Sequence, residues 1–319
     1  VVKEEKDGWY MTARNTVRER LDEAIADAKE SLTGQKTVRA KEESEKKKEA
    51  QKAAKSTAES QKAKSTDDTD PARLKRKLPV LEMTGASGTT DKSGTANSIL
   101  KDEIGNLNQI TGFVPDDSVA KSVTITYRPE STVYVAERYG VFYEDDTWKD
   151  IEHSGKDDEE EMWEHMEDYL SCPTDLQKLT RYYIEEIGGI DGEWKDSKSE
   201  IEAIRKKICE ALWELAVYDT EPGATPAGKD FVEYFLFENR KGFCVHFASA
   251  GTLLFRLAGK EARYAEGYAV PASAFEEQED GTYQAQISGA MGHAWCQVWC
   301  LDDGYWENVE VTPPAGIEQ

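Results

Sequence analysis

The chain contains no apolar run that approaches the roughly 20 residues needed to span a bilayer, and no secretory signal peptide is visible at its start. It begins at Val1 rather than at methionine, so a mature form and an excised piece of a longer protein both remain open. The absence of a long apolar run therefore excludes only a membrane-spanning helix within these 319 residues.

Basic residues are outnumbered by acidic ones. Lysine and arginine number 40 against 63 aspartates and glutamates, which gives a formal net charge of -23. Binding to nucleic acid needs a basic face that contacts phosphates, so this balance argues against such a partner. The same negative charge favours solubility and repels the chain from anionic membrane surfaces.

Cysteine is sparse as well, with five residues too scattered to form a disulfide framework. Two of them, Cys296 and Cys300, share one face of a predicted strand about 13 Å apart, which is too far for a disulfide. No close-spaced set of cysteine and histidine resembles a zinc site, so no metal or cofactor is expected. We expect four of the five to be buried small hydrophobes. The five are Cys172, Cys209, Cys244, Cys296 and Cys300.

Residues 1–96 are predicted to form a charged helical segment followed by a linker. Apolar side chains recur at helical spacing between residues 11 and 33. From Lys41 to Lys64 alanine is the only apolar residue, so this part cannot bury a core and is either a solvated helix or a disordered tether. A coiled-coil partner helix and a spacer from a membrane are both open for residues 11–64.

Residues 97–157 are predicted to form a small β-rich domain such as a sandwich. Apolar and polar residues alternate between residues 123 and 127, and residues 133–135 and 139–143 resemble further strands. Paired aspartates at 116–117 and 145–146 are typical of solvated turns. No EF-hand pattern surrounds them.

Residues 158–319 are predicted to form the catalytic core, with helices first and strands after them. Two helices are expected to begin at capping boxes, Thr174–Gln177 and Ser197–Glu200. Residues 243–257 are apolar nearly all round, which predicts a helix buried on most faces. Strands are predicted at residues 262–270, 282–287, 293–301 and 305–311.

Three residues on separate predicted elements carry the chemistry of this core. Cys244 lies in the first turn of the buried helix, where unpaired N–H groups and the positive end of the dipole lower the pKa of a thiol. The alternative is that Cys244 is one more small core residue. Strand parity permits His293 and Glu310 to be neighbours facing the same helix. Thiol, imidazole and carboxylate are the parts of a Cys-His-acid nucleophile.

Several motifs resemble the transglutaminase-like superfamily, most closely its bacterial membrane-anchored members. They are Gly242-Phe243-Cys244-Val245-His246-Phe247-Ala248, Arg263-Tyr264-Ala265-Glu266-Gly267-Tyr268, Gly292-His293-Ala294-Trp295 and Trp306 through Thr312-Pro313. The resemblance covers residues 160–319, extends loosely over 120–150 and does not include the first hundred. It implies an α+β fold with a papain/transglutaminase-like core, in which a central helix carrying the cysteine packs on an antiparallel sheet.

By this resemblance Cys244 matches the family nucleophile and His293 its base. Glu310 lies where the family usually has aspartate, so Asn308 is an alternative third member. The implied reaction is attack of Cys244 on a protein or peptide carboxamide, with a thioester that passes to an amine or to water. The Cys244 N–H and one side chain, for which Tyr234 and Asn239 are candidates, would bind the oxyanion. A catalytically silent binding or scaffold module is the alternative.

The resemblance also implies a protein or peptide substrate and an extracytoplasmic location, with a membrane tether outside this chain. Oligomeric state is open. Among the other motif residues, His246 is expected to be structural because it lies on a different helix face from Cys244. Trp295 and Trp306 are expected to line the cleft or the core. Arg263 and Gly267 are expected to act as a polar donor and a backbone kink.

Overall fold

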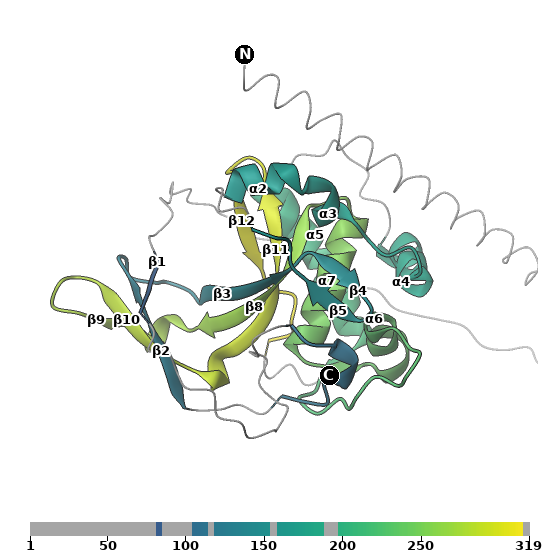
Figure 1. Ribbon diagram of the computed structural model, residues 1–319, viewed down its shortest axis with the longest axis horizontal. Helices are drawn as coiled ribbons and strands as arrows, with labels where there is room; N and C mark the ends of the chain where they lie inside the picture. The colour runs from purple at the N-terminus through teal and green to yellow at the C-terminus, as the bar shows by residue number, and fades with distance from the viewer. Residues whose placement is uncertain (1–80, 85–103, 114–117, 154–157, 188–196, 315–319) are drawn as a thin grey trace, which may run out of the picture.

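The computed structural model describes residues 81–84, 104–113, 118–153, 158–187 and 197–314 (Figure 1). The predicted helix at residues 11–33, the charged stretch from Lys41 to Lys64 and the paired aspartates at 116–117 lie outside these residues.

The main sheet has the strand order β12-β11-β8-β3, with every neighbouring pair antiparallel. Its strands are β3 (Val133–Gly140), β8 (Ala262–Val270), β11 (Gly292–Cys300) and β12 (Tyr305–Val309). The last strand ends two residues before the predicted 305–311, and Glu310 directly follows it. Glu310 is thus held outside the strand ladder.

A second sheet has the order β1-β2-β10-β9 and packs against the far ends of β3 and β8 through a small apolar cluster around Val123, Tyr268 and Ile287. Its strands are β1 (Leu81–Thr84), β2 (Val119–Ile125), β9 (Glu276–Glu277) and β10 (Tyr283–Ser288). In Figure 1 the helices gather at one end of β3 and β8, and this sheet lies at the other.

Both sheets combine strands from before and after residue 157, because β2 pairs with β10 and β3 pairs with β8. The predicted division of the chain at residues 96 and 157 stays a prediction, but backbone pairing crosses it. The hairpin of β4 (Phe142–Glu144) and β5 (Thr147–Lys149) turns at Asp145 and Asp146, whose φ angles are 51° and 55°. Two positive φ angles are those of a type I′ hairpin turn, so a turn at this aspartate pair is confirmed.

The remaining elements are mostly helical. They are α2 (Asp158–Glu164), α3 (Met166–Leu170), α4 (Gln177–Tyr182), α5 (Lys198–Leu215), α6 (Phe231–Tyr234) and α7 (Cys244–Leu257), with the parallel pair β6 (Val217–Tyr218) and β7 (Lys241–Gly242) between them. The capping box at the start of α5 is confirmed, because the Ser197 side chain accepts from the Glu200 N–H.

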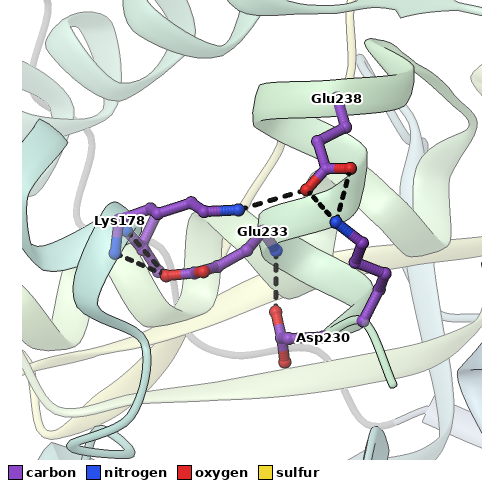
Figure 2. A network of polar contacts seen from close by, with 6 residues as sticks. Lys178, Asp230, Glu233 and Glu238 are labelled. Atoms are coloured by element: carbon purple, nitrogen blue, oxygen red, sulfur yellow. Dashed lines mark hydrogen bonds and ion pairs between the residues drawn. The ribbon is translucent and has the colours of Figure 1, made fainter. Parts of the chain in front are cut away.

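The capping box predicted for α4 is wrong. The helix begins with Leu176 as its N-cap and no local side-chain cap. Figure 2 shows the reason: Glu233 on α6 reaches across, and its carboxylate accepts from the Lys178 and Leu179 N–H groups at 2.6 and 3.1 Å. The Glu238 carboxylate forms ion pairs with the ammonium groups of Lys178 and Lys229. A tertiary contact thus satisfies the helix end that a local residue was expected to cap.

All residues of α7 are buried, as the apolar pattern predicted. Its body packs on the face of β11 that carries Cys296, whose Sγ would lie 2.9 Å from a Cβ at Gly251. The turn from α7 to β8 is fixed by Arg256, which is fully buried and donates to the carbonyls of Ala262 and Ser171 at 2.7–2.9 Å. These contacts hold the helix rigidly against the sheet.

Candidate active site

Cys244 is the first residue of α7. The chain that leads into this helix is so closely packed that position 242 has room only for glycine. A Cβ at Gly242 would lie 2.6 Å from the His246 side chain and 2.7 Å from the Phe235 ring. Phe243 between them is extended, with φ of −121°. Cys244 itself is 2 % exposed. The tight entry places the sulfur at the N-terminus of a buried helix, where backbone N–H groups have no intrahelical acceptor.

His246 lies in a cage of aromatic rings, with ring centroids of Phe231, Phe235 and Phe243 at 4.5, 5.2 and 4.9 Å. Its Nδ1 accepts from the Phe243 N–H at 3.4 Å. Burial lowers the pKa of His246 to about 3, so the ring is neutral. These contacts give it the structural role that was expected.

His293 is the second residue of β11 and pairs with Gly267 of β8. Its Nε2 lies 2.5 Å from Glu310 Oε2, which leaves Nδ1 as the ring nitrogen for the sulfur. Burial lowers the pKa of His293, but the charge and hydrogen bonding of Cys244 and Glu310 outweigh burial and raise it to about 10. The ring is therefore an imidazolium at neutral pH, and Nε2–H donates to the carboxylate.

The Glu310 carboxylate accepts three hydrogen bonds. Besides His293, the Tyr134 hydroxyl from β3 donates to Oε2 at 3.0 Å and the Thr312 N–H donates to Oε1 at 2.7 Å. Burial raises the pKa of Glu310, but the contacts with His293 and Thr312 outweigh it and hold the pKa below its ordinary value. The carboxylate is charged at neutral pH and fixed in orientation. Tyr134 is a site residue that sequence analysis placed only in a strand.

Helix α5 holds the backbone that carries Glu310. The Arg205 guanidinium donates to the Glu310 carbonyl at 3.2 Å, and the Trp213 indole donates to the Val311 carbonyl at 2.9 Å. Arg205 is itself held by Glu202 at 2.7 Å. The segment after β12 is therefore anchored from a second element.

Asn308, the predicted alternative to Glu310, makes other contacts. Its Oδ1 accepts from the Trp295 indole and the Gln297 amide, both at 2.8 Å. Trp295 is fully buried and packs on Tyr134, with ring centroids 4.9 Å apart. Asn308 thus orients a core tryptophan that supports Tyr134, while Glu310 contacts the imidazole.

Two further expectations from the motifs are borne out by the contacts. The Arg263 guanidinium is sandwiched between Tyr139 and Trp306, at 3.7 and 4.3 Å from the ring centroids, and donates to Gln297 at 2.8 Å. Gly267 lies where β3 has a bulge, and a Cβ there would come within 2.0 Å of the Val135 carbonyl oxygen. Both residues are structural.

The shared face of His293 and Glu310 is observed, but α7 lies differently from the prediction. The body of the helix packs on the opposite face of β11, where Cys296 Sγ donates to the Ala248 carbonyl at 3.4 Å. Parity correctly predicted that His293 and Glu310 are neighbours, although Glu310 follows the end of β12. It did not show on which side the helix would pack.

The other cysteines differ sharply from Cys244 in their surroundings. All five are free, and all but Cys172 are buried. Burial raises the pKa of the Cys172 thiol to about 12 and those of Cys209 and Cys300 to about 11, and it raises that of Cys296 further still. Within the described residues, no group of three or more histidine, cysteine or acidic side chains is arranged to hold a metal ion.

Glu266 is a buried carboxylate on β8, and burial makes its charged form unfavourable. It is 2 % exposed, accepts from the Tyr264 hydroxyl at 2.6 Å, and lies 3.6 Å from Arg138, too far for a hydrogen bond. Its Oε2 has no hydrogen-bond partner. Burial raises its pKa to about 7, against the effects of Tyr264 and Arg138.

Replacing Glu266 by glutamine is therefore expected to stabilise the protein at pH 8 by roughly 2–4 kcal/mol, because one pKa unit corresponds to about 1.4 kcal/mol. The unfolded carboxyl ionises near its ordinary value of 4.5, before the folded one. The gain of the variant over wild type should thus grow between pH 4.5 and 7 and then level off. Urea unfolding at several pH values measures it, and a gain that does not vary with pH would contradict it.

The buried helix, the antiparallel sheet and the Cys-His-Glu cluster together define a transglutaminase-like fold. Residues 189–311 match the family model of the transglutaminase-like superfamily. The chain therefore contains a transglutaminase-like domain.

Two curated relatives match this part of the chain. A protein-glutamine gamma-glutamyltransferase of Pseudomonas aeruginosa is 37% identical over 105 residues, which cover 32% of this chain and 14% of the relative. The Bacillus subtilis protein YebA is 33% identical over 99 residues, covering 30% of this chain and 13% of YebA. The chain thus matches only a small part of the length of either relative.

Among solved structures, the periplasmic domain of TgpA from Pseudomonas aeruginosa bound to ethylmercury is similar, at 23% identity and a TM-score of 0.27 over 45% of this chain and 47% of that one. The family and the first curated relative support a general role in cysteine-based acyl transfer.

Within the described residues, no helix is both long and apolar enough to cross a bilayer.

Proposed function

We propose that this chain transfers acyl groups from a protein or peptide carboxamide through a thioester at Cys244. The observation that carries the proposal is the 2.5 Å contact of His293 Nε2 with Glu310, beside a cysteine in the first turn of a buried helix. His293 acts as acid and base, and Glu310 holds its ring in one orientation and stabilises its positive charge.

The reaction follows from these positions. The Cys244 thiolate attacks the carboxamide carbon, and the C–N bond then breaks as His293 gives its proton to the leaving amine. This forms a thioester and a neutral imidazole. An acceptor amine or water next gives a proton to His293 and attacks the thioester, and the C–S bond breaks. Thiolate and imidazolium are thereby restored.

The donor is a protein-bound or peptide-bound glutamine, and the acceptor is an amine. The name of the Pseudomonas aeruginosa relative supports the donor. The low exposure of Cys244 supports the acceptor, because a site that excludes water favours transfer to an amine over hydrolysis. A peptidase or amidase, with water as acceptor, is the alternative outcome.

The proposed location is extracytoplasmic, with a membrane tether outside this chain. The similar solved structure is a periplasmic domain, which supports this location. Cys209, Cys296 and Cys300 are free thiols in buried sites, where their raised pKa values oppose reaction.

A test uses a protected glutaminyl-glycine dipeptide as donor and hydroxylamine as acceptor, with hydroxamate and free ammonia as readouts. Hydroxamate in excess of hydrolysed donor is expected, and hydrolysis alone would indicate the amidase. Cys244→Ala should lower the rate by at least about 10⁴-fold. The matched control Cys172→Ala removes a half-buried thiol elsewhere and should leave the rate unchanged.

A second candidate is a silent binding module that keeps this fold without turnover. The observation that favours it is that Glu310 lies where the superfamily usually has aspartate. In that case neither hydroxamate nor ammonia forms, and no acyl adduct of Cys244 is found by mass spectrometry after acid quenching.

A further inference from the structure

The oxyanion site of the proposed reaction needs a side-chain donor beside the N-terminus of α7. Attack of sulfur on a carbonyl places negative charge on its oxygen, and preorganised donors stabilise that charge. The Cys244 N–H supplies one donor, because the first N–H groups of a helix have no intrahelical acceptor. A second donor must come from a neighbouring element.

Strand β6 is that neighbouring element. It runs parallel to β7 with Tyr218 opposite Gly242, two residues before Cys244. The pair is tied by the Val217 N–H to the Arg240 carbonyl at 3.0 Å and by the Asp219 N–H to the Gly242 carbonyl at 2.8 Å. Arg240 also donates to the Leu215 carbonyl at the end of α5. Tyr218 is therefore held next to the entry of α7 by backbone bonds.

Other side-chain donors around α7 are already committed. The Asn239 amide, one of the predicted candidates, donates to the carbonyls of Pro222 and Lys241 at 3.1 and 3.2 Å. The Tyr264 hydroxyl donates to Glu266, and the Trp148 indole donates to Ser249.

The side-chain donors on the strands near His293 also already form hydrogen bonds. The Tyr134 hydroxyl donates to Glu310, and the Trp295 indole donates to Asn308. Tyr234, the other predicted candidate, lies on α6 and forms no hydrogen bond with Cys244, His293 or Glu310.

Tyr218 differs from all of these. Its side chain is 43 % exposed, and its hydroxyl forms no hydrogen bond with another described residue. Partial burial, followed by the charges of Cys244 and Glu310, raises the pKa of Tyr218 to about 12. Its phenol therefore keeps its proton over the whole working range and lies within electrostatic reach of both site residues.

We propose that the Tyr218 hydroxyl is the second oxyanion donor and acts together with the Cys244 N–H. The assignment rests on the proposed acyl transfer. The phenol donates to the carbonyl oxygen as charge develops in the tetrahedral intermediate, and the bond weakens again when the thioester carbonyl forms. Tyr218 thereby stabilises the transition state more than the bound substrate.

Tyr218→Phe removes only the hydroxyl from an exposed ring, so the fold should be unaffected. Its kcat for acyl transfer, with p-nitrophenyl acetate and the glutaminyl dipeptide as donors, is expected to fall by about 10²–10³-fold. Alkylation of Cys244 by iodoacetamide passes through no carbonyl oxyanion, and its rate should stay within about threefold. The matched control is Tyr127→Phe, at a tyrosine that is 37 % exposed and lies two residues after the end of β2.

The outcomes separate the two proposals. An active wild type whose rate is unchanged by Tyr218→Phe overturns the oxyanion assignment alone. Equal losses in acyl transfer and alkylation also overturn it, because a positional role would affect both. A wild type that alkylates rapidly but is acylated by neither donor overturns the proposed function and this assignment with it.

Discussion

Replacing His293 by alanine is expected to slow the alkylation of Cys244 by iodoacetamide about 10²-fold at pH 6. A thiol without a charged partner is only roughly 0.3 % thiolate at that pH, because its pKa is about 8.5. In the wild type His293 is charged at this pH, since its pKa is raised to about 10, and its removal leaves Cys244 without a charged partner. The rate of adduct formation at Cys244, followed by mass spectrometry of its peptide, measures the effect.

The other four cysteines provide an internal control. Burial raises the pKa of each thiol, so they should react slowly in both proteins. Their rates should not change in His293→Ala. Slow and equal labelling of all five cysteines in the wild type would contradict the prediction and leave Cys244 as a core residue.

Replacing Glu310 by glutamine is expected to lower kcat/KM for acyl transfer by about 10²–10⁴-fold, by analogy with loss of the acid in other triads. Glutamine keeps the length and an oxygen that accepts from Thr312, but it removes the charge that Tyr134 and His293 contact. Without that charge the imidazolium is less stable, so the pKa of His293 must fall below about 10.

The lower pKa of His293 in Glu310→Gln should be visible in the pH–rate profile. Since protonated His293 supplies the leaving amine with its proton, the alkaline limb of the wild type should lie near pH 10 and that of Glu310→Gln at lower pH. Glu307→Gln is the matched control, because Glu307 lies three residues earlier on β12 and is paired with the surface residue Lys198. An alkaline limb that does not move in Glu310→Gln would exclude contact between the two charges in solution.

Local signals in the sequence predicted much of the region around α7. The apolar run from residue 243 predicted the buried helix with Cys244 in its first turn, and the structure confirms this helix. Alternation related His293 to Glu310, and they are in contact. Their catalytic roles stay predictions, because contact alone does not establish reactivity.

What sequence analysis missed depends on pairing between distant segments. Tyr134 donates to Glu310 from 176 residues away, and only the antiparallel pairing of β3 with β8 brings it there. The α4 cap was missed for the same reason, since Glu233 lies on another helix. Tyr218 is exposed and adjacent to Gly242 only through β6. Periodicity within one segment carries no information about such partners.

The distance along the chain between Tyr134 and Glu310 has a consequence for how the thiol becomes reactive. Closing a loop of 176 residues costs entropy that only late, long-range contacts recover. Collapsed chains that already contain helix α7 would still lack the Tyr134 hydroxyl that fixes the Glu310 carboxylate. Chemical reactivity at Cys244 would then report completed folding rather than helix formation, and a partly folded chain would not acylate its neighbours.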